Sequence, residues 1–133
     1  MIFIDTGAFL ARYLTQDQYH SRAIAAWERI RRRQEPCFTS NFVLDEFFTL
    51  LARRAGYGYA AERARHILAS SAFTVLRPAL EDELEAVNLF SKYADQEVSF
   101  TDCVSFVLIR SNRIRKVFSF NRHFRHSGAE ILS

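Results

Sequence analysis

The stretch M-I-F-I-D-T-G, residues 1–7, determines how the rest of this chain is interpreted. Residues 2–4 are β-branched or aromatic and form a short apolar run, which is typical of a buried parallel strand. Thr6 and Gly7 supply a capping residue and a breaker before the helical pattern of residues 8–14, so the strand ends at Asp5. In open α/β sheets ligands bind at the carboxyl ends of the strands. Asp5 is therefore either an acid of a functional site or a cap of the following helix.

The composition indicates one ordinary globular domain over residues 1–133, with 49% hydrophobic and 25% charged residues. Cys37 and Cys103 have no metal-ligand spacing, and we expect them to be buried thiols in a reducing compartment. No apolar run approaches the ~20 residues that span a bilayer, and the N-terminus has no basic leader pattern. We therefore expect no membrane contact and a cytoplasmic location.

The chain carries a net charge of +3 with a sequence pI of about 9.1, and arginine supplies almost all of the positive charge. Arginine binds phosphate groups in a bidentate manner, so an arginine-rich basic domain favours a nucleic-acid partner. Part of this charge has a simpler explanation, because Arg31–Arg33 end a predicted helix, where cations suit the helix dipole.

Strands and helices alternate along the predicted chain, which favours a parallel sheet with right-handed crossovers. The predicted strands cover residues 2–4, 37–39, 71–76 and 115–120, with a short last strand within 128–132. The predicted helices cover residues 8–14, 17–33, 41–54, 59–69, 78–93 and 103–110, and the third and fourth of these form a helical hairpin.

Glu46 and Asp102 are two further acids that are candidates for a functional site. Glu46 lies between Phe42 and Leu50 on an apolar helix stripe, and a buried carboxylate requires a cation, a metal or another acid nearby. Asp102 follows Ser99 with the spacing of a helix cap, so it belongs in a first helical turn. A salt bridge for Glu46 and a plain capping role for Asp102 are the structural alternatives.

Polar and basic residues also follow the strand predicted at 115–120. The segment N-R-H-F-R-H, residues 121–126, begins where that strand ends. Asn121 is thus expected at the same sheet edge as Asp5, since the carboxyl ends of parallel strands share an edge. Arg122, His123 and Arg125, together with Arg110 on the preceding helix, are candidates for phosphate contact or for a solvated surface.

The combined motifs resemble the PIN-domain family, and specifically the VapC-type toxins of bacterial and archaeal toxin–antitoxin pairs. The resemblance covers the whole chain. Its carriers are I-D-T-G at 4–7, T-S-N-F-V-L-D-E at 39–46, S-F-T-D-C at 99–103 and F-S-F-N-R-H-F at 118–124.

This resemblance implies a three-layer α/β/α sandwich with a central, mostly parallel sheet of four to five strands. It also implies a metal-dependent endoribonuclease, with Asp5, Glu46 and Asp102 at the acidic ligand positions and Asn121 where the family has a fourth acid. That replacement predicts a more weakly held second metal. A cognate antitoxin and a homodimer are the partners that the resemblance implies, and the hairpin of residues 41–69, with Tyr57 and Tyr59 at its turn, is a candidate part of the antitoxin's docking groove.

The chemistry of the residues points the same way. Clustered carboxylates without His or Cys ligands favour Mg²⁺ or Mn²⁺, and such ions activate water for attack on a phosphodiester. Two other functions remain open. An aspartyl-nucleophile phosphatase would need an acid where Gly7 stands. A PIN-like module that binds RNA or protein without cleaving it would be explained by Asn121.

Overall fold

Five short strands form a fully parallel sheet in the order β3-β2-β1-β4-β5, and the computed structural model describes all of residues 1–133. The strands are β1 (Ile2–Ile4), β2 (Cys37–Ser40), β3 (Phe73–Leu76), β4 (Lys116–Phe118) and β5 (Glu130–Leu132). The central strand β1 is completely buried, which agrees with its uninterrupted apolar sequence. The predicted parallel sheet of four to five strands is confirmed.

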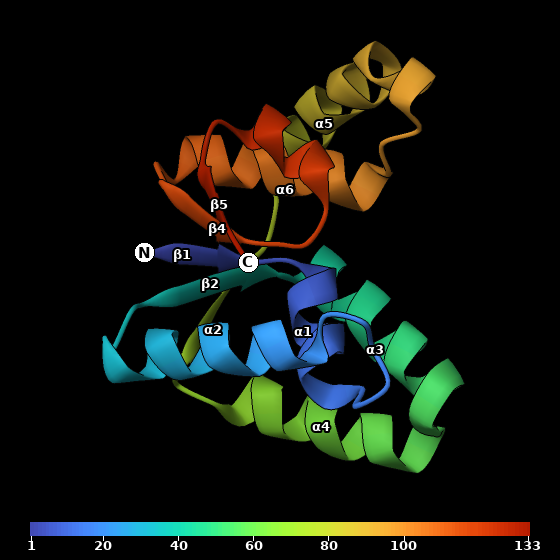
Figure 1. The fold of residues 1–133 in the computed structure, drawn as a ribbon. Coiled ribbons are helices and arrows are strands. Elements are labelled where there is room, and N and C mark those ends of the chain that lie inside the picture. Colours follow the sequence, from blue (N-terminus) through green and yellow to red (C-terminus); the bar gives the residue numbers. More distant parts are fainter.

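Helices cover both faces of this sheet, so the three-layer prediction is also confirmed (Figure 1). One layer contains α1 (Thr6–Tyr13), α2 (His20–Arg32), α3 (Asn41–Ala55) and α4 (Tyr57–Ala69). The other contains α5 (Leu80–Lys92), α6 (Phe100–Ser111) and the short 3₁₀ helices η1 (Ala94–Gln96) and η2 (Arg122–Ser127). The predicted hairpin is formed by α3 and α4, which meet at Gly56 with a φ of 100°.

The strand order places the start and the late part of the chain side by side. From β1 the chain runs outward through β2 to β3, and it returns to the other side of β1 as β4. The backbone N–H of Asp5 donates to the carbonyl of Phe118 over 3.1 Å, which joins the carboxyl ends of β1 and β4. This point, where the strand order reverses, is where open α/β sheets place their ligands.

Side-chain capping explains where the helices begin. Ser40 and Ser99 cap α3 and α6 by accepting from the backbone N–H groups of Val43 and Asp102. The helix predicted from Asp17 begins instead at His20, because the Asp17 carboxylate accepts from the N–H of Tyr19 and fixes a turn there. The helix predicted from Pro78 begins at Leu80, because the Asp82 carboxylate accepts from the N–H of Ala79 at the cap.

Aromatic rings fill much of the core between the sheet and the helices. Phe9 of α1 stacks on Phe47 of α3 with ring centroids 5.0 Å apart, and Phe106 of α6 meets Phe124 edge-on at 5.1 Å. Cys37 and Cys103 are buried free thiols, as predicted. No helix combines the length and the apolar character that crossing a membrane requires.

Candidate active site

Asp5 lies at the carboxyl end of β1 with its side chain 4% exposed. Its carboxylate makes no capping hydrogen bond to α1. Instead Oδ2 accepts a hydrogen bond of 2.8 Å from the Ser119 hydroxyl, which comes from the end of β4. Asp5 is the N-cap residue of α1, but its side chain does not form the cap, and the neighbouring strand holds the carboxylate instead.

Asp102 reaches the same place from the first turn of α6, where it is 7% exposed. Its backbone N–H donates a hydrogen bond to the hydroxyl of Ser99. Oδ2 accepts from the Asn121 side-chain amide over 3.2 Å, and the Asn121 oxygen accepts from the N–H of His123 over 2.9 Å. Asn121 thus caps the start of η2 and contacts Asp102 at the same time.

Glu46 of α3 completes an open cavity of about 570 Å³ at this edge of the sheet. The side chain is half-buried, whereas the neighbouring Asp45 is exposed. The cavity is lined by residues from several segments: Asp5, Thr6, Gly7, Leu10, Asp17, Gln18, Tyr19, Glu46, Arg54, Glu97, Ser99, Asp102, Phe120, Asn121 and His123.

The acids in this cavity have no cationic partner. None of the ion pairs of the protein involves Asp5, Glu46 or Asp102. Burial raises the pKa of Asp102 well above the usual aspartate range, and the charges of Asp5 and Glu46 raise it further. Burial also raises the pKa of Asp5, although the hydrogen bond from Ser119 opposes this shift. The cavity therefore favours a bound cation.

The donor chemistry fits a hard divalent ion that keeps part of its hydration shell. No group of three or more His, Cys, Asp or Glu side chains lies close enough together to ligate one ion directly. Mg²⁺ is commonly held by one or two carboxylates and several waters, so a close pair of buried aspartates with Glu46 across the cavity meets its needs. Thr6 Oγ1 adds a buried oxygen that lacks a hydrogen-bond partner and belongs to the same cavity lining.

The basic residues selected from the sequence lie in different places. His123 lines the acidic cavity, and Arg122 and Arg125 are exposed on η2 close by. Arg110 does not reach the cavity, because its guanidinium donates to the backbone carbonyl of His126 over 2.7 Å. The cavity also contains Arg54 from the end of α3, which the sequence analysis did not select.

Sequence reasoning missed Tyr19, which lines the cavity, and Ser119, which is buried beneath it and bonded to Asp5. The contact of Ser119 with Asp5 joins positions 114 residues apart, so no local pattern predicted it. Tyr19 stacks on Phe120 across the cavity rim, and these positions are likewise distant in the chain. A serine two residues before Asn121, on the predicted strand, was the only available hint.

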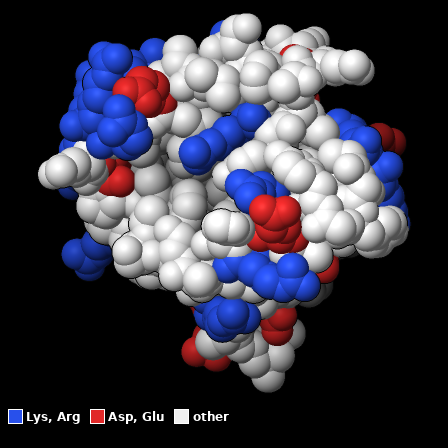
Figure 2. Space-filling view, turned by 90° about the horizontal axis from the view of Figure 1, so that it is seen from below, with Lys and Arg blue, Asp and Glu red and all other residues white.

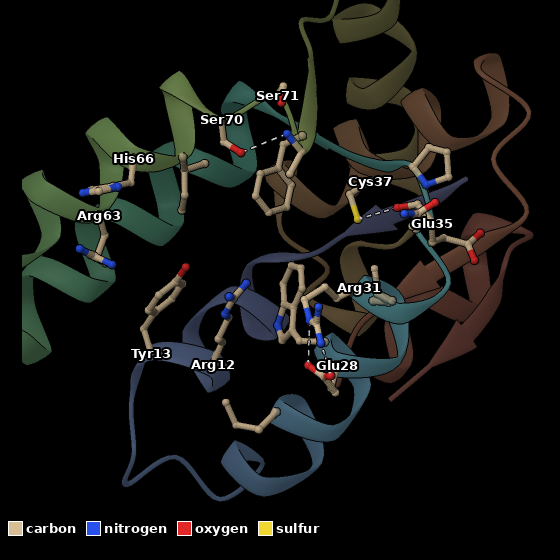
Figure 3. A pocket seen from close by; sticks show the side chains of 18 residues that line it. Arg12, Tyr13, Glu28, Arg31, Glu35, Cys37, Arg63, His66, Ser70 and Ser71 are labelled. Carbon is tan, nitrogen blue, oxygen red and sulfur yellow. Dashed lines mark hydrogen bonds and ion pairs between the residues drawn. The ribbon is translucent and has the colours of Figure 1, made fainter.

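A larger hollow, of about 890 Å³, lies on another part of the molecule and shares no lining residue with the acidic cavity. We call it the α2–α4 hollow. Trp27 and Phe73 are among its lining residues. Arg12 and Tyr13 from α1 and Arg63 from α4 also line it (Figure 3). Lys and Arg side chains border a recess on this side of the protein (Figure 2).

Comparison with known proteins identifies the family. The family model of the PIN domain matches residues 2–129 of this chain. This chain belongs to the PIN-domain family. The PIN domain is 32% identical, over 96% of its length and 95% of the relative's, to the 23S rRNA-specific endonuclease VapC20 of Mycobacterium tuberculosis.

Solved structures agree with this assignment. The PIN domain superposes on the crystal structure of M. tuberculosis VapC20, described as a toxin that cleaves the sarcin–ricin loop, with a TM-score of 0.84, 31% identity and coverage of 97% and 96% of the two chains. FitAcB of Neisseria gonorrhoeae (TM-score 0.74, coverage 100% and 97%) and a toxin–antitoxin complex of Klebsiella pneumoniae (TM-score 0.63, coverage 100% and 97%) share the fold at 14% identity each.

Proposed function

We propose that this PIN domain is a metal-dependent endoribonuclease that acts in the cytoplasm as the toxin of a toxin–antitoxin pair. The observation that carries the proposal is the pair of buried, cation-free aspartates, Asp5 and Asp102, at the reversal point of the sheet. The rRNA-specific endonuclease activity named for VapC20, a relative over nearly the whole chain, supports RNA as the substrate.

Each site residue has a distinct part in this proposal. Asp5 and Asp102 hold Mg²⁺ or Mn²⁺, and Glu46 binds the ion directly or through water. When bound, such an ion lowers the pKa of water and stabilises the charge that develops on a phosphodiester. Ser119 and Asn121 orient the two aspartates through their hydrogen bonds.

The positive residues around the cavity bind the RNA backbone. Arg54 and His123 line the cavity itself, and the exposed Arg122 and Arg125 extend the positive surface along η2. Contacts of this kind position the substrate without reading its sequence. Arg110 instead donates a hydrogen bond to the backbone carbonyl of His126 in η2.

RNA cleavage with and without metal tests this function. We expect cleavage of single-stranded RNA in Mn²⁺ or Mg²⁺, none in EDTA, and a loss of at least about 100-fold in Asp5→Asn and Asp102→Asn. Asp45→Asn is the matched control, because Asp45 is exposed on the same helix as Glu46. Full activity of Asp5→Asn or Asp102→Asn with normal metal dependence would refute the assignment, and RNA binding without cleavage would favour the binding-module alternative.

For the antitoxin we propose the α2–α4 hollow as a docking site for a segment that carries an acidic residue between apolar ones. The Arg12 guanidinium lies 4.9 Å from the Trp27 ring and pairs with no carboxylate. Arg63 Nε is buried without a hydrogen-bond partner. The hairpin contributes to this site through α4, whereas Tyr57 and Tyr59 at its turn are exposed outside the hollow.

For the homodimer we propose the outer face of α5. Leu80, Leu84, Val87 and Phe90 recur at helical spacing there, and each is exposed by nearly half or more. Acidic residues fill the first turn of α5 and Lys92 lies in its last turn. An antiparallel pair of these helices therefore brings opposite charges together while Leu84 of one copy meets Val87 of the other.

A further inference from the structure

Two aromatic rings at the rim of the acidic cavity form an unusually regular stack. Tyr19, from the loop between α1 and α2, and Phe120, from the turn after β4, lie with ring centroids 4.5 Å apart and planes inclined by 1°. Both rings are only partly buried, and both line the cavity that contains Asp5 and Asp102. Apolar surface at the mouth of a polar cavity is thus open to a ligand that enters it.

The surroundings hold this stack in a fixed position relative to the acids. Phe120 contacts the buried Phe118 edge-on at 5.7 Å and directly follows Ser119, which binds Asp5. The loop of Tyr19 is held by Asp17, whose carboxylate accepts from the Tyr19 N–H. These contacts therefore hold the two rings in place beside Asp5 and Asp102, as positioning of a substrate requires.

A guanidinium group extends the same surface. Arg22 lies 5.5 Å from the Tyr19 ring centre and 5.4 Å from that of Phe120. It donates to the Ser133 hydroxyl and forms no ion pair with a carboxylate. The three side chains together offer two ring surfaces and an available positive charge, and we call this group the aromatic platform.

We propose that the aromatic platform, Tyr19 and Phe120 with Arg22, binds one unpaired nucleobase of the RNA beside the phosphate that is cleaved. Proteins hold single-stranded RNA by stacking splayed bases on aromatic rings and guanidinium planes, while the charged groups follow the phosphates. The acidic cavity repels the backbone until a cation is bound, so an uncharged contact at its rim is well suited to hold the strand. This inference rests on the proposed ribonuclease function and assigns that site a base-binding subsite.

The test compares two probes in EDTA, a single-stranded oligoribonucleotide and the same oligomer with abasic residues throughout. We expect the parent protein to bind the intact probe roughly 5- to 100-fold more tightly than the abasic one, the range that stacking of one base produces. Tyr19→Leu and Phe120→Leu should each bring this ratio close to one. Tyr19→Phe and Phe120→Tyr should keep it, and so should Phe48→Leu, which removes a ring outside the cavity.

Cleavage kinetics in Mn²⁺ provide the second measurement. The leucine variants should raise KM for the intact RNA by the same factor with little change in kcat, because stacking binds the ground state and the transition state alike. Leucine variants that retain the parent's binding ratio and KM would overturn the proposal. Because Tyr19 and Phe120 come from separate segments, a folding defect in one variant leaves the other to decide.

The two proposals fail in different ways. If the parent cleaves RNA but does not distinguish the intact from the abasic probe, the aromatic platform is refuted and the ribonuclease function stands. If the parent neither binds nor cleaves RNA in any metal, both proposals fall together.

Discussion

The folded protein favours the neutral form of the Asp102 carboxyl group. Its pKa is raised first by burial and then by Asp5 and Glu46, so the folded chain retains a proton there that the unfolded chain releases at a pH near 4. Between that pH and neutrality the folded state binds more protons than the unfolded state, and stability must fall as pH rises. Ionisation of Asp102 therefore lowers the free energy of unfolding as the pH rises toward the raised pKa of this group.

Replacing Asp102 by asparagine removes this penalty. In EDTA at pH 8 we expect Asp102→Asn to raise the free energy of unfolding by roughly 1–3 kcal/mol, and to have little effect at pH 4. Urea unfolding at both pH values measures the change, with Asp45→Asn as the exposed control. Equal stability of parent and Asp102→Asn at pH 8 would contradict the electrostatic account.

Asn121 is a neutral residue of the candidate site, so it keeps the negative charge of the site lower than an acid at this position would. Its amide nitrogen donates to Asp102 and its oxygen accepts from the His123 N–H, so each of the two atoms already has one partner. Asn121→Asp replaces a donor by a carboxylate, which repels Asp102 until a cation joins them. We expect Mn²⁺ to bind roughly tenfold more tightly to Asn121→Asp, with easier loading of a second ion, as measured by calorimetric titration. Unchanged affinity and stoichiometry would leave Asn121 as a turn residue only.

At the scale of single elements, local sequence patterns predicted most strands and helices, but they did not predict contacts between residues that are far apart in the chain. The cap of α6 was predictable because Ser99 and Asp102 lie three residues apart and bond to each other. The start of α2 was misplaced because Asp17, a good cap residue, fixes a turn instead. The Ser119–Asp5 bond and the Tyr19–Phe120 stack depend on strand order, which no local pattern encodes.

The outer face of α5 forms the proposed dimer contact. A charge on its outer face should separate the proposed dimer, because Val87 would face an apolar residue of the second copy. Sedimentation velocity should show a dimer for the parent and a monomer for Val87→Glu. Leu68→Glu, on the exposed side of α4, is the matched control and should stay dimeric. A monomeric parent at working concentration would refute the dimer itself.

At the scale of the whole molecule, the acidic cavity and the α2–α4 hollow are separate sites on one small domain. Under the proposed function, a variant can therefore lose binding of the antitoxin and keep its nuclease activity. We expect expression of the parent to arrest growth, and co-expression of its antitoxin, obtained by genetic selection for rescue, to restore it.

Arg12→Glu should then remain toxic and resist rescue, because it reverses the charge that the acidic segment meets in the hollow. The cleavage rate of purified Arg12→Glu should match that of the parent. Arg53→Glu, on the exposed end of α3, serves as the charge-reversal control and should be rescued normally. Normal rescue of Arg12→Glu would exclude the hollow as the docking site.

The hydrogen bond between Ser119 and Asp5 can form only late in the synthesis of the protein. Asp5 is synthesised 114 residues before the hydroxyl that orients it, and β1 lacks its neighbour β4 until that late segment has left the ribosome. The two-aspartate centre cannot form before then, because Asp102 and Ser119 come late in the chain. Under the proposed ribonuclease function, the nascent polypeptide therefore cannot cleave RNA until nearly all of this domain has been synthesised.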